Sequence, residues 1–128
     1  MNLLLVMGGG AVGAGARYLT GRAAAVAFGP GWPWGTLIAN VSGGLLMGVL
    51  VGALLRLDAG EPWRLLLGVG VLGGFTTFSS FTLETVAMAQ RGEWLGAGTY
   101  VAVSVAGSIA ALLAGLWAVS VLGRGVAA

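Results

Sequence analysis

The sequence contains no cysteine, no histidine and no lysine, and these absences remove most kinds of catalytic site. Without cysteine there can be no disulfide and no thiol chemistry. Only four carboxylates occur among 128 residues, so the usual side chains for general acid–base catalysis, nucleophilic triads and metal-assisted hydrolysis are missing. We therefore predict that the protein is not an enzyme.

Charge of either sign is also scarce. Charged residues make up 8% of the chain and hydrophobic residues 58%, whereas a soluble domain carries about a quarter charged residues. This composition is typical of a polytopic membrane protein. The formal net charge of +2 comes from scattered arginines, too few for a nucleic-acid surface. We expect no cleavable signal peptide, because no basic segment precedes the first apolar run.

Apolar runs divide the chain into four segments, and a helix needs about 20 such residues to cross the hydrocarbon core. We predict transmembrane helices at residues 3–28, 35–55, 65–90 and 94–122, within one transmembrane domain of residues 1–128. The second span carries a stripe of small residues for close helix contact, formed by Gly44, Gly48 and Gly52. The predicted fold is an all-α membrane protein with four helices per subunit.

The third segment contains the run GGFTTFSSF at residues 73–81, which is poor material for a helix interior. It predicts either a break in the helix or a surface for close helix packing. Non-helical backbone at membrane depth survives only inside protein or beside a polar cavity. If the helix resumes at Thr77, polar groups share one stripe and two rings lie beside it. The stripe is Thr77, Ser80 and Glu84, and the rings are Phe78 and Phe81. This combination favours the break and suggests a permeation path.

Polar residues in the other three spans leave several interpretations open. Arg17 either extends to the lipid headgroups or faces a water-filled vestibule. An unpaired amide in lipid is costly, so Asn40 either bonds a neighbouring helix or lines a pore together with Thr36, one turn earlier on the same face. The fourth span carries a polar stripe at helical spacing, namely Tyr100, Ser104 and Ser108.

The distribution of arginines does not favour either orientation of the protein in the membrane. Four spans bring Arg56, Arg64 and Arg124 to one side and Arg17, Arg22 and Arg91 to the other. Orientation follows the excess of lysine and arginine in short loops, and here three arginines face three. Either an unseen feature decides the orientation, or the protein inserts both ways. Insertion in both orientations would yield antiparallel dimers.

Three motifs resemble those of the small dual-topology fluoride channels of the Fluc (CrcB) family. Residues 9–18, GGAVGAGARY, match the first-helix pattern GGxxGAxxRY. Residues 35–43, GTLIANVSG, match GTLxVNxxG with Ala39 in place of valine, and Leu45 stands where phenylalanine is common. Residues 73–81 are similar to GGxTTFSTF. The match covers all four helices in order.

This resemblance implies an antiparallel homodimer with two fluoride pathways, each lined by both subunits. Asn40 would point into a pore, the edges of the Phe78 and Phe81 rings would face the anion, and Arg17 would add positive potential at a vestibule. The implied polar track consists of Thr36, Ser80, Tyr100, Ser104 and Ser108, with Glu84 as the vestibule carboxylate.

The resemblance also implies a structural sodium ion on the dimer axis, held by the backbone carbonyls of Gly73 and Thr76. A hard cation that prefers oxygen ligands suits carbonyls freed from helix bonding. Such a channel would lie in the cell inner (plasma) membrane and would let fluoride leave the cytoplasm passively, driven by the negative interior.

Two alternatives come from other functional classes. A small four-helix, proton-coupled multidrug exporter requires an acidic residue deep in the first span, and that span has none. Glu84, near the end of the third span, is a poor substitute. A non-transporting scaffold protein would need only the glycine stripes, and it leaves the clustered threonine, serine and phenylalanine residues unexplained.

Overall fold

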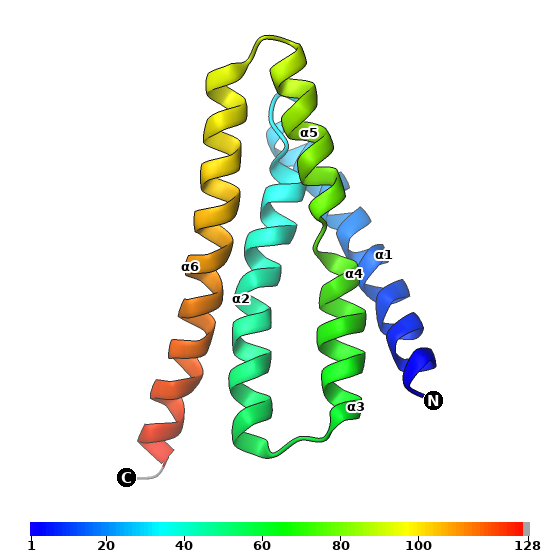
Figure 1. Cartoon of the computed structure of the whole chain (residues 1–128), viewed down its shortest axis with the longest axis vertical. Coiled ribbons are helices and arrows are strands. Elements are labelled where there is room, and N and C mark those ends of the chain that lie inside the picture. Colours follow the sequence, from blue (N-terminus) through cyan, green and yellow to red (C-terminus); the bar gives the residue numbers. More distant parts are fainter. Residues whose placement is uncertain (127–128) are drawn as a thin grey trace.

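The computed structural model describes residues 1–126, and every regular element in that range is a helix (Figure 1). The spans are α1 (Asn2–Phe28), α2 (Trp34–Leu57), a third span in several pieces, and α6 (Trp94–Val126). The third span consists of α3 (Glu61–Trp63), η1 (Arg64–Leu72), α4 (Gly73–Phe75) and α5 (Phe78–Gln90). All four spans are long and apolar enough to cross a membrane. The predicted all-α fold with four spans and a broken third span is therefore confirmed.

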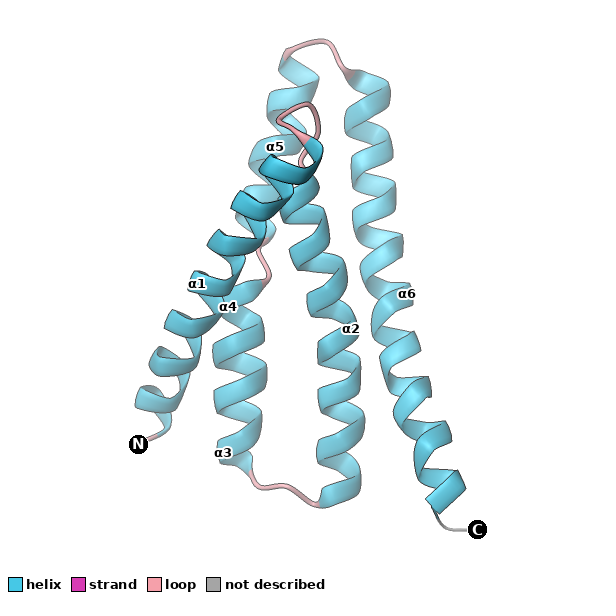
Figure 2. Cartoon of the chain, turned by 180° about the vertical axis from the view of Figure 1, so that it is seen from behind, coloured by secondary structure: helices cyan, strands magenta, loops and turns pink. Residues whose placement is uncertain are grey.

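The spans alternate in direction, so the connections fall at two ends of the molecule (Figures 1 and 2). The turn between α2 and α3 lies at the same end as the start of α1 and the end of α6, and the turns after α1 and α5 lie at the other end. Arg56 and Arg64 are thus near one end, whereas Arg91 follows α5 at the other.

Helices α2 and α6 pack through glycines rather than through large side chains. A methyl group on Gly44 would lie 2.7 Å from the carbonyl oxygen of Ser108, and one on Gly48 would overlap the carbonyl oxygen of Leu112. Because no side chain fits at such approaches, the small-residue stripe predicted on the second span is its contact face with α6.

Helix α1 contacts the third span in the same way. A methyl group on Gly13 would overlap the carbonyl oxygen of Val71, and one on Gly74 would lie 2.6 Å from the carbonyl oxygen of Gly10. The glycines of this crossing therefore let two backbones meet. This contact fixes the position of α4 just before the break.

The break in the third span lies at Thr76 and Thr77, not at the paired glycines that open the run. Gly73 and Gly74 are helical, whereas Thr76 (φ −79°, ψ 156°) and Thr77 (φ −150°, ψ 123°) are extended. Helix resumes at Phe78, one residue later than the sequence suggested. The glycine pair thus serves close packing, and the break occurs where threonine hydroxyls can bond the backbone.

The segment Arg64–Leu72 is a π-helix, which the sequence did not predict. The backbone N–H of Gly73 donates to the carbonyl oxygens of Gly68 and Gly70 at its end. π-Helical turns are rare and usually short. The apolar composition of this segment would suit an α-helix equally well, so only the tertiary packing distinguishes the two.

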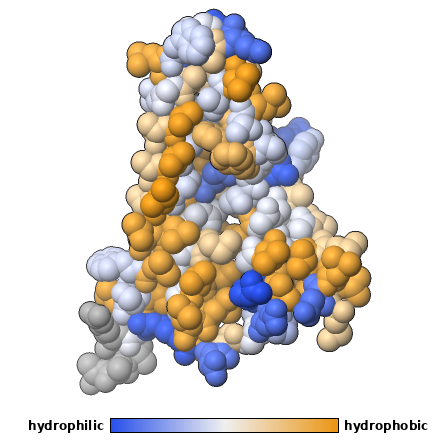
Figure 3. All heavy atoms as spheres, viewed as in Figure 1, coloured by the Kyte–Doolittle hydropathy of each residue, from blue (hydrophilic) through white to orange (hydrophobic). Residues whose placement is uncertain are grey.

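The compact hydrophobic core lies between α2, α5 and α6, near the turns that follow α1 and α5. It consists of Leu37, Phe81, Met88, Ala97 and Tyr100. Most other large apolar side chains face outward, as the apolar outer face in Figure 3 illustrates. Exposed apolar surface of this extent suits lipid or a second protein surface.

Candidate functional site

The ends of the broken helix are held by side chains. The hydroxyl of Thr77 accepts a hydrogen bond from the backbone N–H of Ser80 at 3.2 Å and so caps α5. A threonine N-cap of this kind satisfies one of the backbone donors that a helix start leaves unpaired. The sequence therefore ends one helix and starts another within two residues.

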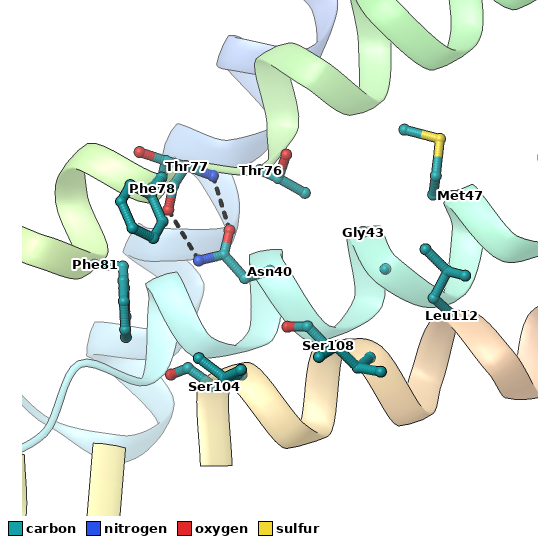
Figure 4. A pocket seen from close by; sticks show the side chains of 13 residues that line it. Asn40, Gly43, Met47, Thr76, Thr77, Phe78, Phe81, Ser104, Ser108 and Leu112 are labelled. Carbon is teal, nitrogen blue, oxygen red and sulfur yellow. Dashed lines mark hydrogen bonds between the residues drawn. The ribbon is translucent and has the colours of Figure 1, made fainter. Parts of the chain in front are cut away.

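Asn40, on α2, bonds the backbone of the break at two points. Its Nδ2 donates to the carbonyl oxygen of Thr77 at 2.9 Å, and its Oδ1 accepts from the N–H of the same residue at 2.7 Å (Figure 4). The amide that the sequence left either structural or pore-lining thus has a clear structural partner. It also lies on the wall of a groove.

This groove, here called the central groove, has a volume of about 420 Å³ and runs between α2, the break and α6 (Figure 4). It collects five of the residues predicted for an ion path, namely Asn40, Phe78, Phe81, Ser104 and Ser108. All the side chains that line it are uncharged. The groove therefore offers hydroxyls, aromatic rings and an amide, but no fixed charge.

Ser104 is the most informative polar group in the central groove. It is buried, and its hydroxyl has no hydrogen-bond partner among the residues that the structure describes. Buried polar atoms nearly always have a partner in the protein or in ordered water. A hydroxyl left free beside a groove is thus available to a bound ligand or water molecule.

Three of the other predicted polar residues form a second cluster, here called the polar triad: Thr36, Glu84 and Tyr100. The hydroxyl of Thr36 donates to Oε1 of Glu84 at 2.8 Å, and the hydroxyl of Tyr100 donates to Oε2 at 2.6 Å. Tyr100 is fully buried and packs on Phe81, with ring centroids 5.3 Å apart. The polar triad therefore adjoins the central groove through this aromatic contact.

Arg17 lies beside another hollow, of about 550 Å³, which Arg22, Thr36, Thr77 and Ser80 also line. Its Nε donates to the carbonyl oxygen of Gly74 at 3.2 Å. Arg17 is thus bound to α4, just before the break, and at the same time lies at a polar hollow, here called the Arg17 hollow.

Neighbouring hollows share wall residues, so the four hollows form a series. Thr77 lines both the central groove and the Arg17 hollow, and Thr36 lines both the Arg17 hollow and a smaller one of about 210 Å³. Glu84 lines that smaller hollow and a fourth one, of about 230 Å³, which reaches Arg91. The predicted site residues are therefore neighbours in space.

The two carbonyls predicted as cation ligands have lost their usual helical donors. In a continuous α-helix the N–H of Thr77 would donate to Gly73, and the N–H of Ser80 would donate to Thr76. Here those N–H groups donate to Asn40 and to the hydroxyl of Thr77 instead. Carbonyl oxygens freed in this way fit a hard cation. Within residues 1–126 no cluster of three or more carboxylate, histidine or cysteine side chains provides another such site.

The sequence did not indicate the role of Trp32, which lies in the turn between α1 and α2. Its ring meets Tyr100 nearly edge to face, with centroids 5.5 Å apart and an interplanar angle of 73°. It also lines both hollows that reach Glu84. The loop before α2 therefore covers the polar triad. No pattern in the sequence brings this loop to α6; only the fold does.

Comparison with known proteins gives consistent results. The family model described as CrcB-like protein, Camphor Resistance (CrcB), matches residues 4–116. A protein of Caulobacter vibrioides (strain NA1000 / CB15N) is 58% identical over 117 residues, which is 90% of this chain and 92% of the relative. One from Sphingopyxis alaskensis is 53% identical over 90% of this chain and 92% of its own length. One from Mesorhizobium japonicum is 45% identical over 91% and 94%. Each is named fluoride-specific ion channel FluC.

Proposed function

The chain belongs to the CrcB-like family, and we propose that it is a fluoride-specific ion channel rather than an enzyme. The observation that carries this proposal is the central groove, where an unpaired buried hydroxyl, that of Ser104, lies beside a pair of phenylalanine rings. The names of the relatives supply fluoride as the ion. The chemistry of the groove lining also supports passage of a small anion.

A small anion that leaves water needs donors and positive edges in place of its hydration shell. The hydroxyls of Ser104 and Ser108 can donate to it, and the hydrogen-bearing edge of an aromatic ring carries the positive side of the ring quadrupole. Phe78 and Phe81, with ring centroids 5.6 Å apart, supply such edges on one wall. Because no fixed positive charge lines the groove, the anion is not trapped there, which conduction requires.

The polar triad supports an extension of the path beyond the rings. In the structure the hydroxyls of Thr36 and Tyr100 both donate to Glu84. An anion that arrives from Phe81 would compete with the carboxylate for these same donors. We infer that it passes by exchanging partners with Glu84, while Ser80 and Arg17 attract it from the adjoining Arg17 hollow.

We also propose that the channel is an antiparallel homodimer, with each path lined by both subunits. Phe78 exposes 76% of its surface, although it lies beside the central groove. A second copy that covered this ring would close the open side of the groove. The even division of arginines between the two ends supports insertion of the copies in opposite orientations.

The carbonyl oxygens of Gly73 and Thr76 are the groups that would hold a structural sodium ion on the dimer axis. Their helical donors bond elsewhere, and rings of uncharged backbone carbonyls bind monovalent cations in ion channels. When bound, the ion would supply positive charge near the start of the anion path. This site rests on the proposed dimer, because two carbonyls from one subunit cannot surround an ion.

The physiological role that we propose is passive release of fluoride across the cell inner (plasma) membrane, driven by the negative interior. The test is ion efflux from proteoliposomes that contain the purified protein, with fluoride compared against chloride at the same gradient. We expect fluoride to leave rapidly and chloride to stay inside. Equal efflux of the two anions would contradict a fluoride-specific channel, and absence of both would contradict a channel of any kind.

A further inference from the structure

We propose that Asn40 and Thr77 are positioning residues that create the cation site, and that Asn40 acts on permeation through this site rather than as a free donor to the anion. This inference rests on the proposed function, because it assigns two residues of the same path to the structural cation. It follows from where the backbone donors of the break are bound.

The carbonyl of Gly73 lacks its α-helical donor. Its α-helical donor would be the N–H of Thr77. That N–H donates instead to Oδ1 of Asn40 at 2.7 Å, the shorter of the two bonds between these residues. The second bond, from Nδ2 to the carbonyl of Thr77, keeps the amide in this orientation. Asn40 thus binds the N–H group that would otherwise donate to the carbonyl of Gly73.

The carbonyl of Thr76 lacks its α-helical donor as well. Its α-helical donor would be the N–H of Ser80, which donates to the hydroxyl of Thr77 at 3.2 Å. The Thr77 side chain therefore frees the carbonyl of Thr76, just as Asn40 frees the carbonyl of Gly73. The two N–H groups that bond elsewhere are the helical donors of the two carbonyls predicted as ligands. The same local arrangement therefore frees both carbonyls.

Neighbouring carbonyls of the break are already occupied. The carbonyl of Leu72 accepts from both the N–H and the hydroxyl of Thr76, and the carbonyl of Gly74 accepts from Arg17. The carbonyl of Thr77 accepts from Asn40. The carbonyls of Leu72, Gly74 and Thr77 are therefore bonded. The carbonyls of Gly73 and Thr76, which lie between them, have lost their helical donors.

Both amide ends of Asn40 are used in this arrangement. A donor already bonded to Thr77 is weakly available to an anion in the groove, because transfer to the anion would leave the partly buried carbonyl of Thr77 unpaired. The contribution of Asn40 to fluoride passage is then indirect: it keeps the break open so that a cation can bind and its charge can attract the anion.

The experiment is a sodium titration of the thermal unfolding of the purified, full-length protein in detergent, with N-methyl-D-glucamine replacing sodium at constant ionic strength. A ligand that binds only the folded state raises its unfolding temperature in a concentration-dependent way. We expect this response in the parent protein. Asn40→Leu and Thr77→Val, which remove the two acceptors at similar volume, should weaken the apparent sodium affinity by about tenfold or more, as expected for loss of a positioning hydrogen bond.

Two conservative variants separate this role from general damage. Asn40→Asp keeps the oxygen that accepts from the N–H of Thr77, and Thr77→Ser keeps the hydroxyl, so both should retain the sodium response. Asn40→Asp should at the same time lose fluoride efflux. Ser108→Ala, which changes the central groove but no group at the break, should also keep the parental sodium affinity.

The inference is wrong if Asn40→Leu and Thr77→Val respond to sodium like the parent, or if the parent shows no response at all. If Asn40→Leu does not fold, the comparison of Thr77→Val with Thr77→Ser decides alone. Failure of the proposed function has a different signature: the parent would respond to sodium but would not release fluoride from proteoliposomes.

Discussion

The hydroxyl of Tyr100 donates a 2.6 Å hydrogen bond to the carboxylate of Glu84, across the contact between α6 and α5. Tyr100 is fully buried, and it also packs on Phe81 and Trp32. One side chain therefore links the aromatic wall of the central groove to Glu84, a carboxylate on α5 within the third span. This relationship makes Tyr100 a junction between the two clusters of the proposed path.

Tyr100→Phe should lower both stability and fluoride efflux. The change removes a donor to a carboxylate, and hydrogen bonds to charged groups contribute about 1.5–3 kcal/mol. Thermal or chemical unfolding of the purified protein measures the first effect. Tyr18→Phe is the matched control for stability, because Tyr18 is 65% exposed. A Tyr100→Phe protein that is as stable and as active as the parent would remove the polar triad from the path.

Asn40→Asp should abolish fluoride efflux with little change in side-chain size. Two negative charges about 4 Å apart at an effective dielectric constant near 20 repel by about 4 kcal/mol. That energy corresponds to about a thousandfold slower passage. The matched control is the same change at Asn2, the other asparagine of the chain, at the start of α1. Normal efflux through Asn40→Asp would show that no anion passes near this position.

Three lysines added to the turn at residues 58–60 should force one orientation in the membrane and inactivate the protein on its own. The arginine balance is even, so a small bias decides topology. Co-expression with a copy that carries three added lysines beside Arg91 should restore fluoride resistance to cells. Full activity of either biased copy alone would contradict the antiparallel dimer.

Gly13→Ala should destabilise the protein, whereas Gly15→Ala should not. The added methyl group at Gly13 would overlap the carbonyl oxygen of Val71, and nothing lies within 4 Å of the corresponding position at Gly15. Overpacking of a tight contact costs about 1–3 kcal/mol, whereas glycine to alanine in an open helix position gains up to about 1 kcal/mol. Unfolding temperatures of the two variants measure the difference. Equal effects would mean that α1 does not pack on the third span as described.

Much of this architecture could be predicted from the sequence, because span length and apolar composition are local properties. The interruption of the third span was also predicted, since paired threonines and serines are poor helix formers. Its position within residues 73–81 was not. Gly74 is as weak a helix former as any residue there, but its contact with Gly10 keeps it helical, and only the fold reveals that contact.

The functional residues, too, could be predicted only in part from the sequence. The sequence indicated which side chains are polar inside the spans, but it could not say which polar group bonds which. Asn40 was left with two roles until its partner, the backbone of Thr77, was known. Trp32 gave no sign of its contact with Tyr100, because the residues are 68 positions apart and meet only in the tertiary structure.

The proposed fluoride path runs along the edges of Phe78 and Phe81. The two rings differ in the single subunit: Phe81 is 8% exposed and Phe78 76%. Replacement of either ring by isoleucine removes the edge electrostatics, worth about 0.5–1.5 kcal/mol per aromatic contact. If the rings only filled space, a swap to an aliphatic side chain of similar volume would cost less than about 1.5 kcal/mol of stability and would leave transport intact.

The most direct measurement is fluoride efflux from proteoliposomes that contain Phe78→Ile, Phe81→Ile or the parent protein, with Phe28→Ile as a control outside the central groove. Size-exclusion chromatography of each purified variant establishes that its assembly is unchanged. We predict that Phe28→Ile conducts like the parent, and that Phe78→Ile and Phe81→Ile each lose about 90% of the fluoride efflux, as a barrier raised by about 1.4 kcal/mol requires. Parental fluoride efflux through both groove variants would contradict the claim that the anion path runs between these rings.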